Sequence, residues 1–526
     1  MKTFNASADY ADGRRFKNHR AVKICVNLRN LVKLLAIRLD WQKTPAKSPV
    51  MRTKVLTGVV LAALSGCSLM PDYQRPDAPV PFAWPANANP AGARQVAQTD
   101  WQQYFADPRL QALIRVALEN NRDLRIATAR LAEARAQYGI QQADRLPNAN
   151  LTAGRNASSS PASTSFTGRE FKQQRYDVGV SLVSFELDFW GRVGSLSAAA
   201  KASYLATEAA QRAFRLSLIA DVANAYLSLL ELQQRAALTA ETARTRAETR
   251  ELVSRRRELG ASSDMDYLQA DGAYQAALAE RANLERQQAA AENLLDLLVG
   301  QSVAGIKDLP AGRSLAEQDI SPDLIAELPA EALLRRPDVL AAEQRLIASN
   351  ANIGAARAAF LPRITLTGSI GTASRTLAGL FNAGSDAWSF QPTLSLPLFD
   401  AGRNSANLDV AEARKVIAVA EYEKTIQQAF REVADLLNAR EKIAEQQAAQ
   451  QANAQAQSRR LTLVEARYKA GISSHLEVLD AQREAYAAEQ ALAQLQRASL
   501  TVATQLYKAL AGESAQAANI RQADSK

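Results

Sequence analysis

The sequence predicts a mixed architecture in which an all-α tunnel of long antiparallel hairpins is joined to a membrane β-barrel. Three observations predict it. A short export leader lies near the N-terminus, and the rest of the chain contains an internal repeat. Each half joins short strands of alternating apolar and polar residues to a very long helical pattern. The repeat therefore organises the 526 residues into two equivalent halves rather than into several unrelated domains.

The positive charge of the chain is concentrated in its N-terminal leader. The formal net charge is +9, but residues 1–66 contain 13 Lys+Arg and 3 Asp+Glu. The remainder is almost balanced, so the net charge does not indicate nucleic-acid binding.

The leader contains a second candidate start site, "MRTKVLTGVVLAALSGC", at residues 51–67. Its apolar stretch is too short to span a membrane, so a signal peptide at residues 51–66 is favoured and an anchor helix is not. The ending at Cys67 resembles the bacterial lipobox, in which the cysteine is lipidated; an ordinary signal peptide is the alternative. Residues 1–50 are then a misassigned upstream extension, or else a genuine amphipathic one. Processing would leave Cys67 as the single cysteine, which excludes a disulfide framework.

An internal repeat divides the chain. "LENNRDLRIATARLAEARA" (118–136) aligns with "LLRRPDVLAAEQRLIASNA" (333–351), and Gly260 aligns with Gly471. Each half is expected to run as short helix, strand, loop, strand, long helix, tip and helix. The expected segments are a first repeat at 67–300, a connector at 301–327, a second repeat at 328–512 and a tail at 513–526.

Two stretches, 195–259 and 403–470, contain neither glycine nor proline and carry apolar residues three and four positions apart. Each predicts a helix of about 100 Å. A plain antiparallel coiled coil has the same periodicity. The strands attached to these helices distinguish the two interpretations.

The strands are short and alternate, and they form two expected β-hairpins at about 147–190 and 361–399. In "RITLTGSI" (363–370) the apolar side chains share one face, and a change of phase at Leu182–Val183 predicts a bulge. Joined by Ser/Gly/Thr-rich loops, they are typical of a membrane barrel, although a soluble sandwich is an alternative. Four strands cannot close a barrel, so several chains must contribute. Three chains would give twelve strands and two would give eight.

Four motifs resemble one family. They are "WQQYFADPRLQALIRVALENNRDL" (101–124), "LPAEALLRRPDVLAAEQRL" (328–346), "PLFDAGRNSA" (397–406) and "RYKAGISSHLEVLDAQR" (467–483). In this order after a lipobox, they are similar to the TolC-like outer-membrane factor lipoproteins of resistance-nodulation-division (RND) multidrug efflux pumps. The resemblance implies a trimeric twelve-stranded barrel in the outer membrane, continued by a helical tunnel in the periplasm. It also implies two partners, a periplasmic adaptor lipoprotein and an inner-membrane RND antiporter.

The function that this resemblance implies is a passive exit duct for drugs or other small toxic compounds, with no enzymatic activity. The sequence contains no phosphate-binding loop, zinc-protease motif or serine elbow. Alternatives are the outer channel of a type I protein-secretion system, which usually lacks a lipobox in this family, and a structural coiled-coil lipoprotein or adhesin. No cofactor is expected apart from the lipid on Cys67.

Both copies of the tip predict a helix end at a glycine, because glycine adopts the left-handed conformation that ends helices. In the family, a leucine ring and a carboxylate ring constrict this region. Charge and position add two more carboxylates, for which a solvated helix-end charge is the alternative. The candidates are Leu476, Asp480, Glu477 and Asp266 for a periplasmic gate, Tyr468, Arg483 and His475 for tip contacts, and Gly260 and Gly471 for the turns.

His475 departs from family members that carry an aromatic residue at this position. His475 and Glu477 together are a weak candidate for a metal site, because stable sites usually have three or four ligands. We therefore predict no metal site. A histidine that responds to pH is the other interpretation.

Overall fold

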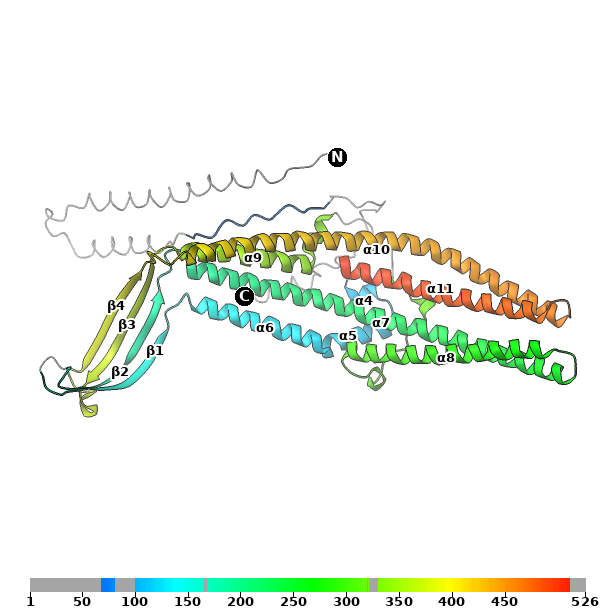
Figure 1. The fold of residues 1–526 in the computed structure, drawn as a ribbon, viewed down its shortest axis with the longest axis horizontal. Helices are drawn as coiled ribbons and strands as arrows, with labels where there is room; N and C mark the ends of the chain where they lie inside the picture. Colours follow the sequence, from blue (N-terminus) through cyan, green and yellow to red (C-terminus); the bar gives the residue numbers. More distant parts are fainter. Residues whose placement is uncertain (1–67, 81–99, 165–167, 319, 321–329, 511–526) are drawn as a thin grey trace, which may run out of the picture. The chain divides into compact units, whose positions relative to one another are not determined.

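The computed structural model describes residues 68–80, 100–164, 168–318, 320 and 330–510. The expected extension, signal peptide, Cys67 and C-terminal tail lie outside these residues. The order of elements, labelled in Figure 1, is α4 (Trp101–Tyr104), α5 (Pro108–Asn120), α6 (Arg122–Ala143), β1 (Ala149–Ser160), β2 (Phe171–Glu186), α7 (Arg192–Glu258), α8 (Asp264–Val299), η1 (Val303–Gly305), η2 (Leu315–Glu317), η4 (Ala330–Arg335), α9 (Pro337–Ala358), β3 (Arg363–Ser374), η5 (Leu377–Gly379), β4 (Asp386–Ser395), α10 (Arg403–Lys469) and α11 (His475–Leu510).

The two halves have helices of equal length. Helices α7 and α10 each contain 67 residues, and α8 and α11 each contain 36. Within each half the long helix packs against the following one as an antiparallel hairpin, and α7 also packs against α9 and α11 (Figure 1). The described segments thus place two equivalent helical hairpins side by side.

The same device starts both long helices. Gly191 and Gly402 precede α7 and α10 with left-handed φ angles of 68° and 83°. In each case an aspartate lies shortly before the glycine, three residues before Gly191 and two before Gly402. Its side chain accepts hydrogen bonds from free backbone N–H groups at the start of the helix. Asp188 bonds Val193 and Gly194 at 3.1 and 2.7 Å, and Asp400 bonds Gly402 and Asn404 at 3.0 and 2.9 Å. These bonds satisfy donors that a helix start leaves unpaired.

The strands form one antiparallel sheet in the order β1-β2-β3-β4. The central pair, β2 with β3, joins the hairpins of the two halves, and β1 and β4 are its edges. The register shifts between Leu182 and Phe185 in β2, which confirms the bulge that the change of phase predicts. Strand β4 ends at Ser395, earlier than the expected 399, because Pro397 has no N–H group to continue the ladder.

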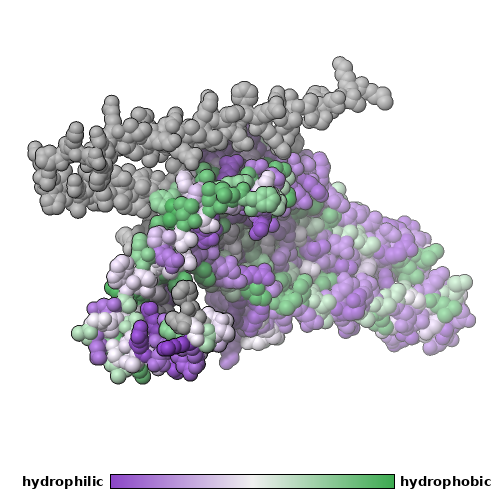
Figure 2. Space-filling model, turned by 60° about the vertical axis from the view of Figure 1, so that its left-hand side comes forward, coloured by the Kyte–Doolittle hydropathy of each residue, from purple (hydrophilic) through white to green (hydrophobic). Residues whose placement is uncertain are grey.

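One face of this sheet is apolar and exposed to the surroundings. The register places Leu151, Val180, Ile370 and Trp388 in one row across all four strands, with exposed fractions of 77%, 45%, 71% and 78%. The neighbouring row on the opposite face is Asn150, Ser181, Ser369 and Ser389. Figure 2 shows hydrophobic and hydrophilic residues interspersed over the sheet, whereas hydrophilic residues predominate over the helices. An exposed apolar face of this kind is what a lipid-facing strand presents.

Asp107 organises the region between the helical hairpins and the connector. This buried residue caps α5 through the N–H groups of Arg109 and Leu110. Its second oxygen accepts bonds from Tyr226 Oη at 3.1 Å, from the N–H group of Arg313 at 3.1 Å and from Gln318 Nε2 at 2.6 Å. One carboxylate therefore ties α5, α7 and the connector together.

Residues 68–80 lie against α9 in the opposite direction. Arg75 binds the buried carboxylate of Glu343 with two hydrogen bonds of 2.7 and 2.8 Å, and Tyr73 donates a third of 3.0 Å. Closer to the N-terminus, the carbonyl oxygen of Pro71 accepts a bond of 2.7 Å from Asn350. The segment is thus held near the end of α9 that continues into β3.

Among the described helices, α7 is the one that is long and apolar enough to cross a membrane. Half of its most apolar window is buried against other parts of the protein. Leu218, Ile219, Val222 and Leu227 lie in the hydrophobic core shared with α5, α9 and α11. We therefore interpret its apolarity as core packing.

Candidate functional site at the helical hairpin tips

The two tips end their long helices in the same way. Gly260 and Gly471 have φ angles of 71° and 75°, in the left-handed region that favours glycine. After Gly260, the N–H group of Ala261 bonds the carbonyl oxygen of Arg256 at 2.7 Å; after Gly471, that of Ile472 bonds Arg467 at 2.9 Å. Both are Schellman turns, which satisfy the last carbonyl groups of a helix.

A short turn then leads into a capping box in each half. Ser263 Oγ accepts from the N–H group of Asp266 at 3.1 Å, and the Asp266 carboxylate accepts from the N–H and hydroxyl groups of Ser263 at 3.0 and 2.7 Å. Ser474 and Glu477 repeat the arrangement with distances of 3.2–3.3 Å. The structure thus places Asp266 and Glu477 at equivalent positions that start helices α8 and α11.

Hydrogen bonds to the serines stabilise the charged form of both carboxylates. The side chain of Ser263 lowers the pKa of Asp266 most, and the backbone N–H group of Ser474 contributes most to the lowered pKa of Glu477. Both groups are therefore ionised at neutral pH. Within the chain, the contacts of Asp266 and Glu477 are therefore those of charges at a helix end, the alternative to a gate role.

Asp480 lies one turn further along α11, and both of its oxygen atoms are engaged. Oδ2 accepts from Arg460 Nη2 of α10 at 2.6 Å, and Oδ1 accepts from Arg483 Nη2 at 2.6 Å. The hydrogen bond from Arg460 is the largest cause of the lowered pKa of Asp480. Arg483 also contacts Glu484 at 3.1 Å, so within this chain it pairs with its own helix rather than with another hairpin.

Leu476 and Asp480 border a groove between the two hairpins. The groove has a volume of about 840 Å³ and receives side chains from α7, α8, α10 and α11. Leu476 is 62% exposed there. The side chains that border this groove include Thr239, Arg246, Glu280, Arg460, Leu476, Asp480, Arg483 and Tyr486.

Tyr468 connects the two tips. Its hydroxyl oxygen accepts a hydrogen bond of 2.9 Å from Arg256 of α7, whose guanidinium carbon also lies 5.4 Å from the centre of the tyrosine ring. The ring of His475 lies 5.8 Å from that of Tyr468. His475 is buried, and neither of its ring nitrogens has a hydrogen-bond partner among the described residues. Burial lowers its pKa, with Arg256 acting in the same direction and the carboxylate of Asp266 opposing them.

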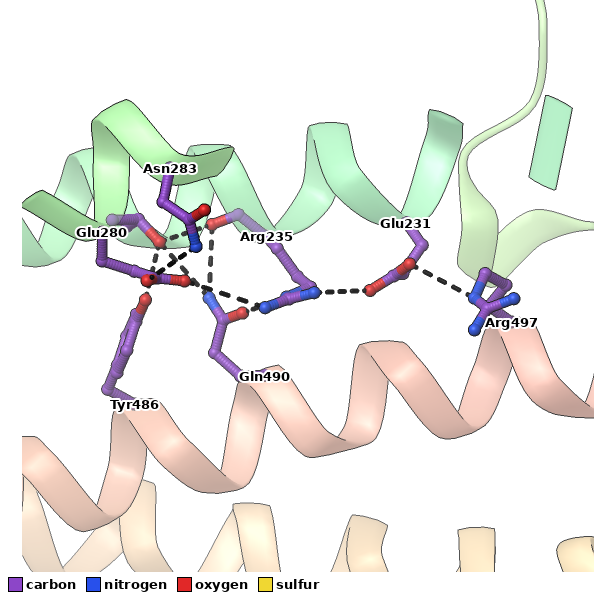
Figure 3. Close-up of polar contacts among 8 residues, drawn as sticks. Glu231, Arg235, Glu280, Asn283, Tyr486, Gln490 and Arg497 are labelled. Atoms are coloured by element: carbon purple, nitrogen blue, oxygen red, sulfur yellow. Dashed lines mark hydrogen bonds and ion pairs between the residues drawn. The ribbon is translucent and has the colours of Figure 1, made fainter. Parts of the chain in front are cut away.

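A second connection between the hairpins lies beyond the groove, and Figure 3 shows it. The side chain of Glu231 in α7 is 6% exposed and pairs with Arg235 at 3.0 Å and with Arg497 of α11 at 3.2 Å. Arg235 also donates to Gln490 of α11 and lies 3.8 Å from Glu280 of α8. We call Glu231, Arg235, Glu280, Gln490 and Arg497 the upper network.

Sequence reasoning did not identify Arg256, Arg460 or the upper network. Their signals are mostly not local, because Arg256, Arg460 and the upper network have partners in other helices, up to 266 positions away for Glu231 and Arg497. In the part of the chain that the structure describes, there is no group of three or more His, Cys, Asp or Glu residues able to hold a metal ion.

An exposed apolar sheet face and paired helical hairpins with capped tips define the class of outer-membrane channels. The model of the outer membrane efflux protein family matches residues 113–301 and 328–512, which is one match for each half and more than half of the chain. The chain therefore belongs to the outer membrane efflux protein family.

Curated relatives and solved structures agree with this assignment. Outer membrane protein OprJ of Pseudomonas aeruginosa is 46% identical over 430 residues, which cover 81% of this chain and 89% of OprJ. The solvent efflux pump outer membrane protein SrpC of Pseudomonas putida is 44% identical, over 83% of this chain and 93% of SrpC. The open-state MtrE outer membrane channel of Neisseria gonorrhoeae superposes with a TM-score of 0.77 at 38% identity, over 85% and 98% of the two chains.

This protein is accordingly an outer-membrane channel component of a tripartite efflux pump, with its helical part in the periplasm. The expected family, function and location are confirmed. Its family is one of transport channels and not of enzymes.

Proposed function

We propose that three copies of this chain form a passive duct across the outer membrane and the periplasm. The observation that carries this proposal is the four-stranded sheet, with an apolar face and free edges at β1 and β4. Free backbone groups at a sheet edge are costly in lipid, and joining the edges of neighbouring chains satisfies them. Three sheets of four strands give a twelve-stranded barrel.

The cargo we propose is small toxic organic compounds, including drugs and solvents. SrpC is named as part of a solvent efflux pump, and it shares 44% of its aligned residues with this chain. The duct would work with a periplasmic adaptor lipoprotein and an inner-membrane RND antiporter, which supplies the energy. The lipid on Cys67 and the apolar outer face of the barrel would both attach the channel to the outer membrane.

We further assign the periplasmic gate to Leu476 and Asp480. Leu476 is an exposed apolar side chain one turn from a charged one, and both border the groove at the free end of the second hairpin. In a trimer, three apolar side chains would resist wetting and three charged groups would select ions. Asp266 and Glu477 would hold the helix starts that position this gate.

Two measurements test the duct. Light scattering of the detergent-solubilised protein, corrected for bound detergent, is expected to give three chains per particle, and a stable monomer would contradict the barrel. In cells that contain the adaptor and antiporter, deletion of the channel is expected to raise toluene accumulation, and the wild-type gene should restore efflux. Unchanged accumulation on deletion would contradict the proposed cargo.

Single-channel recording in planar bilayers tests the gate without partner proteins. The double variant Leu476→Ala, Asp480→Ala is expected to raise conductance several-fold, because it removes the apolar and the charged part together. The matched control is Ile126→Ala, Asp435→Ala, which alters two exposed residues of α6 and α10. Equal conductance in the two double variants would place the gate elsewhere.

A further inference from the structure

We propose that Arg460 is a positioning residue that holds the Asp480 carboxylate and cancels its charge, and thereby sets the ion selectivity of the channel tip. This inference rests on the proposed gate role of Asp480 and adds a residue that the tip motif does not contain. It concerns the charge that the gate presents to passing ions.

The geometry separates the roles of the two arginines that contact Asp480. Arg483 lies on the same helix and divides its guanidinium between Asp480 and Glu484, at 2.6 and 3.1 Å. Arg460 comes from α10, and Asp480 is its carboxylate partner among the described residues, at 2.6 Å. Because α10 and α11 run antiparallel from the Gly471 turn, Arg460 holds Asp480 toward the neighbouring helix of the hairpin.

These four residues balance in charge. Arg460 and Arg483 carry two positive charges, and Asp480 and Glu484 carry two negative ones. Without Arg460 each chain would present one net negative charge at this level, and three chains around an axis would present three. A cluster of like charges in a narrow opening attracts counter-ions. Arg460 therefore lowers the cation selectivity that Asp480 would otherwise give the tip.

The contact is better suited to setting charge than to stabilising the fold. The side chains of Arg460 and Asp480 are 44% and 37% exposed, and ion pairs this exposed to water add little to stability. Both residues also border the groove, next to Leu476. Replacing Arg460 should accordingly leave a folded channel with an altered charge.

The test measures reversal potential in a KCl gradient, and block by hexaamminecobalt(III), on single channels of the full-length protein. Arg460→Gln is expected to increase cation selectivity and to lower the half-blocking concentration about tenfold, the scale for charges a few ångströms apart. Arg460→Lys keeps the charge and should restore wild-type block. Arg459→Gln is the matched control, because Arg459 is adjacent and exposed and makes no ion pair with the described residues.

The variant Asp480→Asn distinguishes this inference from the gate proposal. Alone, it should shift selectivity toward anions; combined with Arg460→Gln, it should remove the added cation block. If Asp480→Asn changes selectivity but Arg460→Gln behaves like Arg459→Gln, the gate stands and the role of Arg460 is wrong. If block deepens equally in Arg460→Gln and in the double variant, another carboxylate binds the cation and the inference is again wrong. If Asp480→Asn changes nothing in either background, the gate proposal itself is wrong.

Discussion

The hydroxyl oxygen of Tyr468 in α10 lies 2.9 Å from the guanidinium group of Arg256 in α7, although 212 residues separate them in the sequence. This bond joins the free ends of the two hairpins within one chain. The upper network joins the same hairpins beyond the groove, through Glu231 and Arg497. The two hairpins are therefore connected at their tips and again beyond the groove.

We expect Tyr468→Phe to raise the open probability of single channels, because it removes the hydrogen bond to Arg256 and keeps the ring. A hydrogen bond to a charged group contributes about 1.5–3 kcal/mol, enough to change an equilibrium by tenfold or more. The control is Tyr267→Phe: the Tyr267 ring lies 4.1 Å from the guanidinium carbon of Arg257 in the same hairpin. An equal increase in both variants would show that the effect does not depend on the contact between hairpins.

The upper network predicts an effect on stability. In Glu231→Gln, the guanidinium groups of Arg235 and Arg497 lose their common carboxylate in a site where the glutamate side chain is 6% exposed. Breaking a buried ion pair typically costs about 3 kcal/mol or more. Thermal unfolding in detergent should therefore occur at a clearly lower temperature. Glu241→Gln, which breaks an exposed pair with Arg244 on the same helix, should leave the unfolding temperature unchanged. Similar decreases of the unfolding temperature in the two variants would show that burial of the upper network does not determine its contribution to stability.

His475 predicts that acid loosens the tips. Burial lowers its pKa below the ordinary value of 6.5, so unfolding of the tip takes up a proton between the two pKa values. The folded tip is fully favoured above about pH 6.5, and this contribution is lost as the pH falls through the lowered pKa. Hydrogen-exchange protection of residues 466–478 in the wild type should therefore be constant above about pH 6.5, the ordinary histidine pKa, and should fall as the pH decreases below it. It should stay constant in His475→Phe.

The charged groups around His475 provide the alternative cause. Asp266 of α8 and Arg256 of α7 are the charged groups that act on its pKa, and Tyr468 of α10 packs beside it. If His475→Phe shows the wild-type loss of protection, acid acts through another group and the role of the histidine is wrong.

Cys67 lies outside the described residues, and its lipidation stays a prediction from the sequence. Cys67→Ser should abolish labelling with a radioactive fatty acid, whereas Cys25→Ser should retain it. Transport should fall only partly in Cys67→Ser, because the apolar face of the sheet also holds the channel in the membrane. Labelling that persists in Cys67→Ser would place the mature N-terminus elsewhere.

Periodicity and glycine positions allowed much of the fold to be predicted. Alternation in residues 363–370 placed Ile364, Leu366 and Ile370 on one face, and the register confirms it. Gly260 and Gly471 end helices α7 and α10 by left-handed turns, as the repeat predicts. These features are local, so the sequence alone can carry them.

The contacts of the candidate site were harder to predict, for two reasons. A serine three residues before Asp266 or Glu477 is the sequence signature of a capping box, and this spacing, unlike the charge alone, indicates the start of a helix. Arg460 and Arg256 carry no such signature. Both lie in helices of 67 residues with many similar arginines, and only the packing of helices shows which arginine reaches across.

The order of strands has a consequence for how copies of this chain can join. The edge strands are unlike, since β1 belongs to the first half of the repeat and β4 to the second. A junction that pairs β4 of one copy with β1 of the next is heterologous, so the same rotation repeats from copy to copy until the ring closes. It also continues the antiparallel alternation of the sheet without a break. Every copy in such a ring faces the same direction, and all the hairpins leave the membrane on one side.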